Sequence, residues 1–200
     1  DPGKDTNSTV VTFAGSQEGV EEAAFKAIKK AAELIDMYKH SGAHQRMGAT
    51  DVCPLVPIAG ITMAETAACA QRLAERVGRE LGIPVYLYEA AQPDPARKNL
   101  AVIRAGEYEG LAHKLADPAW APDRGPASFN PRSGATVIGA RDFLVAFNVN
   151  LNTTSTRRAN AVAFDVREAG RPRREGHPLT GKVVTGADGQ PVMLPGTLKA

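Results

Sequence analysis

Apolar residues recur at helical spacing in two long segments of the N-terminal half of the chain. In the first segment, Ser16 can cap a helix whose apolar positions continue to Ile35, and the pattern ends among basic residues and glycine near His40. In the second segment, Thr62 and Glu65 form a capping-box pattern, and a glycine follows the last apolar position. Two amphipathic helices are therefore predicted, over residues 17–39 and 63–81.

Runs of β-branched, aromatic and other apolar residues indicate strands. The first is TVVTFAG (9–15), and the second is DVCPLVPI (51–58), whose prolines favour an edge strand or an irregular one. The third is IPVYLYE (83–89), which reads as a buried strand. The fourth lies within GATVIGARDFLVAFNVNL (134–151). In that segment the alternating apolar residues are Phe143, Val145, Phe147 and Val149.

Shorter helices and loops fill the rest of the chain. Tyr108, Leu111 and Leu115 mark a short helix, and residues 159–166 form a last helix ended by a glycine. The proline-rich segment 117–134 excludes regular structure, and loops of that length inside a domain are usually functional. After residue 171 the chain reads as a loop, with a possible hairpin turn at Asp188–Gly189.

The order of these elements predicts an α+β fold. We expect a ferredoxin-like two-layer sandwich, with a mostly antiparallel or mixed sheet and with helices on one face. The chain begins without methionine and stops in an apolar stretch, which indicates a fragment.

Composition and charge exclude several classes of protein. The 200 residues are 43% hydrophobic, which is enough for a core, and the net charge of +2 does not indicate a nucleic-acid surface. No run of apolar residues is long enough to span a membrane. Cys53 and Cys69 fit neither a disulfide framework nor a zinc pattern. We therefore expect reduced thiols and a cytoplasmic location.

Chemistry that can be recognised from short motifs is sparse. His40 and His44 have a zinc-like spacing, but Ser41 and Gly42 interrupt the helix between them and the usual glutamate is absent, so no metal is predicted. The glycine pair in GATVIGAR lacks the lysine of a phosphate-binding loop, and no G-x-S-x-G nucleophile motif exists. The carboxylates of Glu107 and Glu109 are best explained as favourable charges at a helix N-terminus.

Five longer segments, taken together, resemble one family. They are LIDMYKHSGAHQRMGATDVCPLVP, IPVYLYEAA, LAVIRAGEYEGL, WAPDRGPASFNPRSGAT and GARDFLVAFNVNL. In this order they resemble glutamate formimidoyltransferase, the formiminotransferase of histidine breakdown, over residues 1–170. The resemblance implies two ferredoxin-like subdomains with folate bound between them. Residues 1–170 are then expected to be the first subdomain without its opening strand, and residues 171–200 the linker and the truncated start of the second.

The resemblance also implies the site residues. Within H-x-G-x-H-x-R-M-G the catalytic residue is the second histidine, His44. Histidine has an ordinary pKa of about 6.5, so it can both take and return a proton near neutral pH. Arg46 and Asp51 are candidates to fix the loop or orient the ring, and Arg97 matches an arginine of structural importance. The residues implied in folate binding are Asp1, Gly125, Pro126, Ala127, Ser128, Phe129, Asn130, Pro131, Arg132, Ser133 and Gly134.

The implied reaction moves the formimino group from N-formimino-L-glutamate to N5 of tetrahydrofolate, the cosubstrate, and no metal takes part. The expected partners are these small molecules and, as the resemblance implies, a second copy of the chain in a homodimer, but neither nucleic acid nor a membrane. Two alternatives stay open. One is a formyltransferase that uses N-formylglutamate, and the other is a folate-binding module without catalysis.

Overall fold

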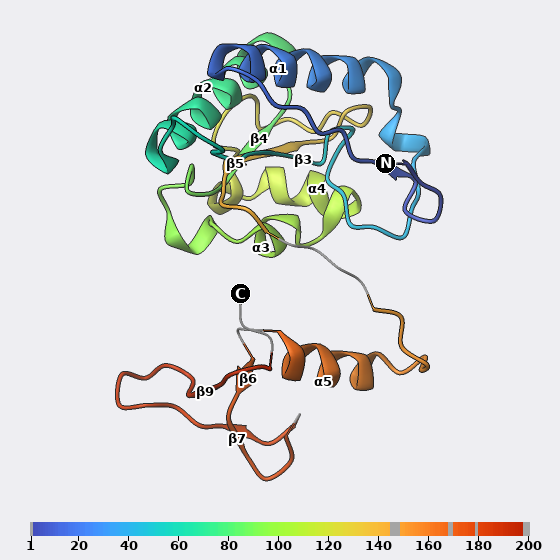
Figure 1. The fold of residues 1–200 in the computed structure, drawn as a ribbon. Helices are drawn as coiled ribbons and strands as arrows, with labels where there is room; N and C mark the ends of the chain where they lie inside the picture. Colours follow the sequence, from blue (N-terminus) through green and yellow to red (C-terminus); the bar gives the residue numbers. More distant parts are fainter. Residues whose placement is uncertain (1, 145–148, 168–169, 179, 198–200) are drawn as a thin grey trace. The chain divides into compact units, whose positions relative to one another are not determined.

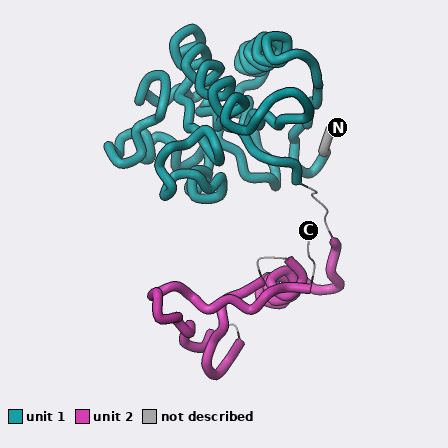
Figure 2. The backbone as a smooth tube through the Cα atoms, turned by 60° about the vertical axis from the view of Figure 1, so that its left-hand side comes forward, with its two compact units in different colours: residues 1–144 teal, residues 145–200 magenta. Residues whose placement is uncertain are grey.

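The computed structural model describes residues 2–144, 149–167, 170–178 and 180–197. The chain divides into two compact units, residues 1–144 and 145–200 (Figure 2). In the described part of the chain, no helix has both the length and the apolar character needed to cross a bilayer.

The first unit is built around a three-stranded sheet in the order β3-β5-β4. Its strands are β3 (Val52–Leu55), β4 (Val85–Glu89) and β5 (Thr136–Ala140). The central strand β5 is buried along its whole length and runs parallel to both neighbours. The β3 strand, which contains Pro54, lies at the edge of this sheet, as its prolines predicted.

Helices cover both faces of this sheet (Figure 1). On one face lie α1 (Gln17–Leu34) and α2 (Met63–Leu81), and on the other lie α3 (Leu100–Arg104) and α4 (Glu107–Ala116). The α2 helix has the predicted capping box at Thr62 and Glu65 and ends at Gly82, which adopts the left-handed conformation. Short 3₁₀ turns are η1 (Met37–Lys39), η2 (Pro95–Arg97) and η3 (Pro118–Trp120).

Alternation along the strands produces two hydrophobic cores. In β4, Val85 and Leu87 belong to the core beneath α1 and α2, whereas Tyr86 and Tyr88 belong to the core beneath α3 and α4. Because successive side chains of a strand point to opposite faces, a strand buried on both sides needs a continuous apolar run. The run in IPVYLYE meets this requirement, so the predicted buried strand is confirmed.

The prediction of a mostly antiparallel or mixed sheet with helices on one face is wrong for this sheet. The strands are parallel because each connection is a crossover: α2 links β3 to β4, and the segment with α3 and α4 links β4 to β5. The two crossovers place their helices on opposite faces. The coarser prediction of an α+β protein is confirmed.

Three local predictions also differ from the structure. The predicted strand 9–15 is strand only at its start, where β2 (Ser8–Thr9) pairs antiparallel with β1 (Pro2–Gly3), and Val10 and Val11 are exposed. The first long helix ends at Leu34, and His40 instead follows the η1 turn. Of the predicted alternating strand, Phe143 is exposed and outside any strand, Val149 is exposed, and residues 145–148 lie outside the described residues.

In the described residues of the second unit lie one helix and two small antiparallel ribbons. The α5 helix (Thr156–Val166) is capped by Ser155. The β6 strand (Arg171–Pro172) pairs with β9 (Met193–Leu194), and β7 (Arg174–Glu175) pairs with β8 (Lys182–Val183). Backbone hydrogen bonds close a turn at 186–190, which includes the predicted Asp188–Gly189.

Candidate active site

The segment 40–51, here called the histidine loop, leads from the η1 turn to the start of β3. The β1–β2 hairpin holds the N-terminal part of this loop. Ala43 donates its backbone N–H to the carbonyl oxygen of Asp5 at 3.0 Å, and Asn7 donates its amide Nδ2 to the carbonyl of Ser41 at 2.9 Å. A side chain at Gly42 would come within 2.1 Å of the Thr6 carbonyl oxygen, so only glycine allows this approach.

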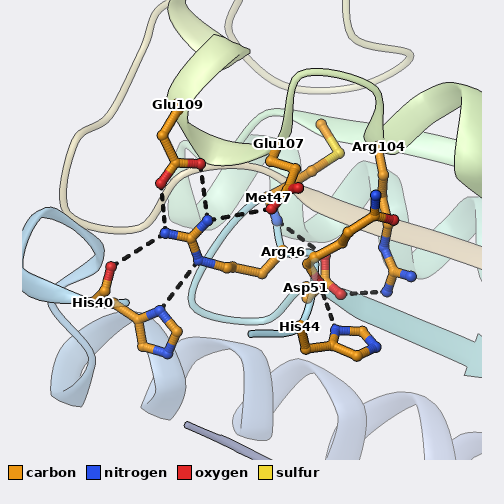
Figure 3. Close-up of polar contacts among 9 residues, drawn as sticks. His40, His44, Arg46, Met47, Asp51, Arg104, Glu107 and Glu109 are labelled. Carbon is orange, nitrogen blue, oxygen red and sulfur yellow. Dashed lines mark hydrogen bonds and ion pairs between the residues drawn. The ribbon is translucent and has the colours of Figure 1, made fainter. Parts of the chain in front are cut away.

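The two histidines of the loop are in different hydrogen-bonding states (Figure 3). Arg46 donates Nε–H to Nδ1 of His40 at 3.3 Å, so the His40 Nε2 atom carries the proton and donates it to the carbonyl of Asn7 at 2.7 Å. His44 instead contacts the carbonyl oxygen of Gln45 through Nδ1 at 2.6 Å. A carbonyl only accepts, so Nδ1 carries the proton of the neutral ring, and in that tautomer Nε2 presents its lone pair.

Only one of these rings is therefore able to act as a base. Both nitrogens of His40 are occupied, whereas Nε2 of His44 has no hydrogen-bond partner among the described residues. The His44 side chain is exposed. It lies beside a cavity of about 460 Å³ whose lining includes its neighbours Gly42 and Gln45, together with Arg46 and Glu107, but not His44 itself.

Arg46 is the most heavily bonded side chain of the loop. Its guanidinium group forms a two-pronged ion pair with Glu109, at 2.8 Å from Nη1 and 2.6 Å from Nη2, and a longer contact of 3.5 Å to Glu107. It also donates to the backbone carbonyl of His40 at 3.2 Å. Hydrogen bonding by Arg46 lowers the pKa of Glu109, and the same bond is the largest cause that raises the pKa of Arg46.

Asp51 fixes the other end of the loop. Its Oδ1 atom accepts the backbone N–H of Met47 at 3.0 Å, and its Oδ2 atom pairs with Arg104 of α3. Both side chains of this ion pair are largely buried, at 19% and 12% exposed. The backbone carbonyl of Asp51 accepts from Val137 at 3.0 Å, which connects the loop to β5.

The C-terminal half of the proline-rich loop lies against the histidine loop. Ala49 donates to the carbonyl of Ser133 at 2.9 Å, and Ala135 donates to the carbonyl of Met47 at 3.1 Å. Tyr108 bridges the two loops: its backbone N–H donates to the Arg46 carbonyl at 2.9 Å, and its hydroxyl donates to the carbonyl of Pro131 at 2.5 Å.

Not all of the residues implied in folate binding lie at this junction between the two loops. Phe129, 37% exposed, contacts Tyr108 with ring centroids 5.6 Å apart, and Asn130 holds the following turn by accepting from Arg132 and Ser133. The guanidinium group of Arg132 donates to the carbonyl of Glu33. At the loop's other end, Gly125 packs against α2. Pro126, Ala127 and Ser128 connect the two ends, and Asp1 lies outside the described residues.

Arg97 serves a different part of the unit. Its guanidinium group lies 5.7 Å from the ring centre of Tyr86 and 5.5 Å from that of Trp120, and it donates to the carbonyl of Ala121 at 2.9 Å. Arg97 therefore anchors the start of the proline-rich loop, which includes η3, to the Tyr86 ring of β4. None of its contacts involves the histidine loop.

Sequence reasoning missed the residues that hold the loop from α3 and α4. Arg104 and Glu109 are 53 and 63 residues away from their partners Asp51 and Arg46. Glu109 does lie in the first turn of α4, as expected for a helix-terminal charge. The only further signal was the unusual density of charged residues in RAGEYEG. Among the described residues, no group of three or more histidine, cysteine, aspartate or glutamate side chains is arranged to hold a metal ion.

Gly48 is the point at which the two loops touch, and we expect it to tolerate no side chain. A β-carbon there would lie 2.3 Å from the carbonyl oxygen of Ala135 and 2.5 Å from that of Ser133. Gly48→Ala should therefore lower the free energy of unfolding by about 1–3 kcal/mol, as overpacking does. Urea denaturation measures the change.

Gly110→Ala is the matched control, because the space around Gly110 in α4 is open and alanine favours a helix. This variant should be as stable as the unchanged protein or more so. Equal unfolding midpoints for the Gly48→Ala variant and the unchanged protein would contradict the close junction.

Comparison with known proteins agrees with the resemblance found in the sequence. Residues 1–141 match the model of a family described as the formiminotransferase domain, N-terminal subdomain. The formimidoyltransferase-cyclodeaminase of Dictyostelium discoideum is 50% identical over 175 residues, which are 88% of this chain and 32% of that protein. The glutamate formimidoyltransferases of Streptococcus pyogenes serotype M1 and Thermoplasma acidophilum are 49% and 45% identical, over 82% and 80% of this chain.

The chain is shorter than these relatives. It spans 55% and 54% of the two glutamate formimidoyltransferases and about a third of the Dictyostelium protein. The family match covers 141 of the 200 residues and includes the histidine loop and all of the proline-rich loop. The chain thus belongs to the formiminotransferase family and contains its N-terminal subdomain.

Proposed function

We propose that the protein of which this chain is part transfers the formimino group from N-formimino-L-glutamate to N5 of tetrahydrofolate, giving 5-formiminotetrahydrofolate and glutamate. Relatives named glutamate formimidoyltransferase, at 45–49% identity, support this reaction. The observation that carries the proposal is the contact between the histidine loop and the proline-rich loop, through Ala49 and Ser133 and through Met47 and Ala135. Residues 47–49, which follow the candidate base His44 closely in the chain, thereby contact residues 133–135 at the end of the candidate folate-binding segment.

His44 is proposed as the general base. When tetrahydrofolate is bound, it supplies the amine that attacks the formimino carbon. As the new C–N bond forms, the Nε2 atom of His44 accepts the proton that this amine loses. As the C–N bond to the donor breaks, the same atom returns the proton to the nitrogen of the departing glutamate. The Nδ1 contact with the carbonyl of Gln45 supports this role because it favours the neutral tautomer in which Nε2 carries the lone pair.

The proline-rich loop offers suitable surface for a folate ring. Phe129 presents a partly exposed aromatic face beside Tyr108, and aromatic faces favour stacking of flat rings. The hydroxyl of Ser133 is buried and has no hydrogen-bond partner among the described residues, which leaves one polar atom available near the junction. We therefore propose Phe129, Ser128 and the turn at 130–134 as the folate-contacting part of the loop, with Gly125, Pro126 and Ala127 in supporting positions.

Arg46 and Asp51 are proposed to position the histidine loop, and Arg97 to hold the start of the proline-rich loop. A homodimer, which the family resemblance implies, is part of the proposal. So is a cytoplasmic location, which suits the free thiols of Cys53 and Cys69.

A direct assay separates this function from its alternatives. The full-length protein is incubated with tetrahydrofolate and either N-formimino-L-glutamate or N-formyl-L-glutamate, and the folate product is followed by absorbance. We expect turnover with the formimino donor to exceed turnover with the formyl donor by at least about tenfold, the difference that one hydrogen bond can make. Preference for the formyl donor would assign the alternative transferase activity. Folate binding without turnover of either donor would assign a binding module.

A further inference from the structure

The α3–α4 corner holds the histidine loop at both ends. One ion pair joins Arg104 of α3 to Asp51, and the other joins Glu109 of α4 to Arg46 (Figure 3). The corner between the helices is tight, since Gly106 and Glu107 both have positive φ values, of 88° and 53°. This turn lets α4 begin directly after α3, so that both charged side chains are directed at one short loop.

The Arg46–Glu109 pair is the more informative of the two. The Arg46 guanidinium group is 12% exposed and uses both Nη atoms on Glu109, Nε on the His40 ring and Nη2 on the His40 carbonyl. Residues 40 and 46 are thereby tied to each other, and the loop between them contains His44. Two parallel N–H···O⁻ bonds fix the plane of the guanidinium group, which a single contact does not do.

Glu109 is the group that fixes this plane. Glu107, the other nearby carboxylate, makes only a single contact of 3.5 Å with Arg46. We propose that Glu109 is a positioning residue for the reaction: by holding the Arg46 guanidinium group, it closes residues 40–46 into a rigid loop that keeps the His44 ring in place. This inference rests on the proposed function of His44.

The chemistry of the pair agrees with a clamp that works near neutral pH. Because Arg46 lowers the pKa of Glu109, the carboxylate stays charged below the ordinary range for glutamate. The stabilisation from this pair is present above the ordinary pKa of glutamate and is lost as the pH falls through the lowered pKa of the folded protein. The clamp is therefore closed over the whole range in which histidine acts as a base.

Glu109→Gln in the full-length protein tests the proposal. Glutamine keeps the size of the side chain but loses the charge and one of the two acceptors. We expect kcat to fall by about tenfold in Glu109→Gln and by up to about 10²-fold in Glu109→Ala, because misplacing a catalytic group lowers a rate by that much. The KM for tetrahydrofolate should change by less than about twofold in both variants.

The matched control is Glu22→Gln, which breaks the ion pair between Glu22 and Arg76 on α1 and α2, the helices on the opposite face of the sheet from α3 and α4. It removes the same type of charge from the same type of partner. Its kcat should stay within about twofold of the unchanged protein. Circular dichroism verifies that each variant is folded.

A double-mutant cycle gives the decisive readout. If Glu109 acts through Arg46, adding Glu109→Gln to the Arg46→Met variant should lower kcat no further. Additive losses, or an unchanged kcat in Glu109→Gln alone, would overturn the positioning role while leaving the transferase function intact.

A second measurement separates failure of this inference from failure of the proposed function. The His40 and His44 ring protons are followed by NMR in the unchanged protein and in Glu109→Gln. The clamp predicts that both rings change their chemical shift and that His44 becomes more mobile. If neither donor is turned over, the proposed function fails. The clamp fails separately if the histidine signals are identical in the two proteins.

Discussion

Replacing His44 by alanine should lower turnover by about 10²–10⁴-fold and leave the fold unchanged, because a positioned general base contributes that much to a rate. The side chain is exposed, and its one hydrogen bond in the described part of the chain is to the carbonyl of Gln45, so its removal disturbs no packing. The measurement is kcat in the full-length protein with the formimino donor, together with the unfolding midpoint.

His40→Ala is the informative comparison. His40 has both ring nitrogens occupied, by Arg46 and by the carbonyl of Asn7, so it supports the loop and offers no free nitrogen to a substrate. We expect this variant to be less stable, because the Asn7 carbonyl and the Arg46 Nε–H lose their partner, and to retain more activity than His44→Ala. Activity of His44→Ala within a factor of two of the unchanged protein would end the assignment of His44 as the base.

Asp51→Asn should lower the free energy of unfolding by about 3–5 kcal/mol, the cost of breaking a buried ion pair by removing one charge. The amide can still accept from the backbone of Met47, but the guanidinium group of Arg104 then lacks its counter-charge in a largely buried place. Because Asp51 lies between the histidine loop and β3, we expect kcat to fall as well. Urea denaturation and steady-state kinetics measure the two effects.

Asp36→Asn is the control for this variant. Asp36 also accepts a backbone N–H, from Tyr38, but its ion pair with Lys39 is exposed, with the lysine side chain at 80%. Exposed pairs contribute about 0–1 kcal/mol, so its loss should be small. Unchanged turnover and unchanged substrate affinity in Asp51→Asn would count against the supporting role of Asp51. An unfolding free energy equal to that of Asp36→Asn would count against the buried pair.

Much of the fold could be predicted because its signals are local. The capping box at Thr62 and Glu65, the left-handed Gly82 and the apolar run of β4 each involve residues within one turn or one strand. The wrong strand at 9–15 shows the limit of such signals. A β-branched run is not by itself enough to make a strand, and Val10 and Val11 are exposed and lie outside any strand.

The direction of the sheet was beyond local prediction for the same reason. Whether two strands run parallel depends on the path of the chain between them, and the helices of both crossovers were themselves correctly expected, α2 in full and α4 in part. The antiparallel expectation came from the order of the predicted elements, which included segments 9–15 and 143–151 as strands. In the structure, segment 9–15 is not part of the three-stranded sheet, and residues 145–148 lie outside the described residues.

The sequence alone predicted the long helices with their caps, the buried strand, the family and the candidate base. Each of these is encoded in neighbouring residues or in motifs that follow one another in order. Tertiary structure alone decided which of the two histidines keeps a free nitrogen, and that Arg46 and Asp51 are held by Glu109 and Arg104. Ion pairs between residues more than fifty positions apart leave no periodic trace in a sequence. They arise only when the sheet and its two layers of helices bring distant charges within reach of each other.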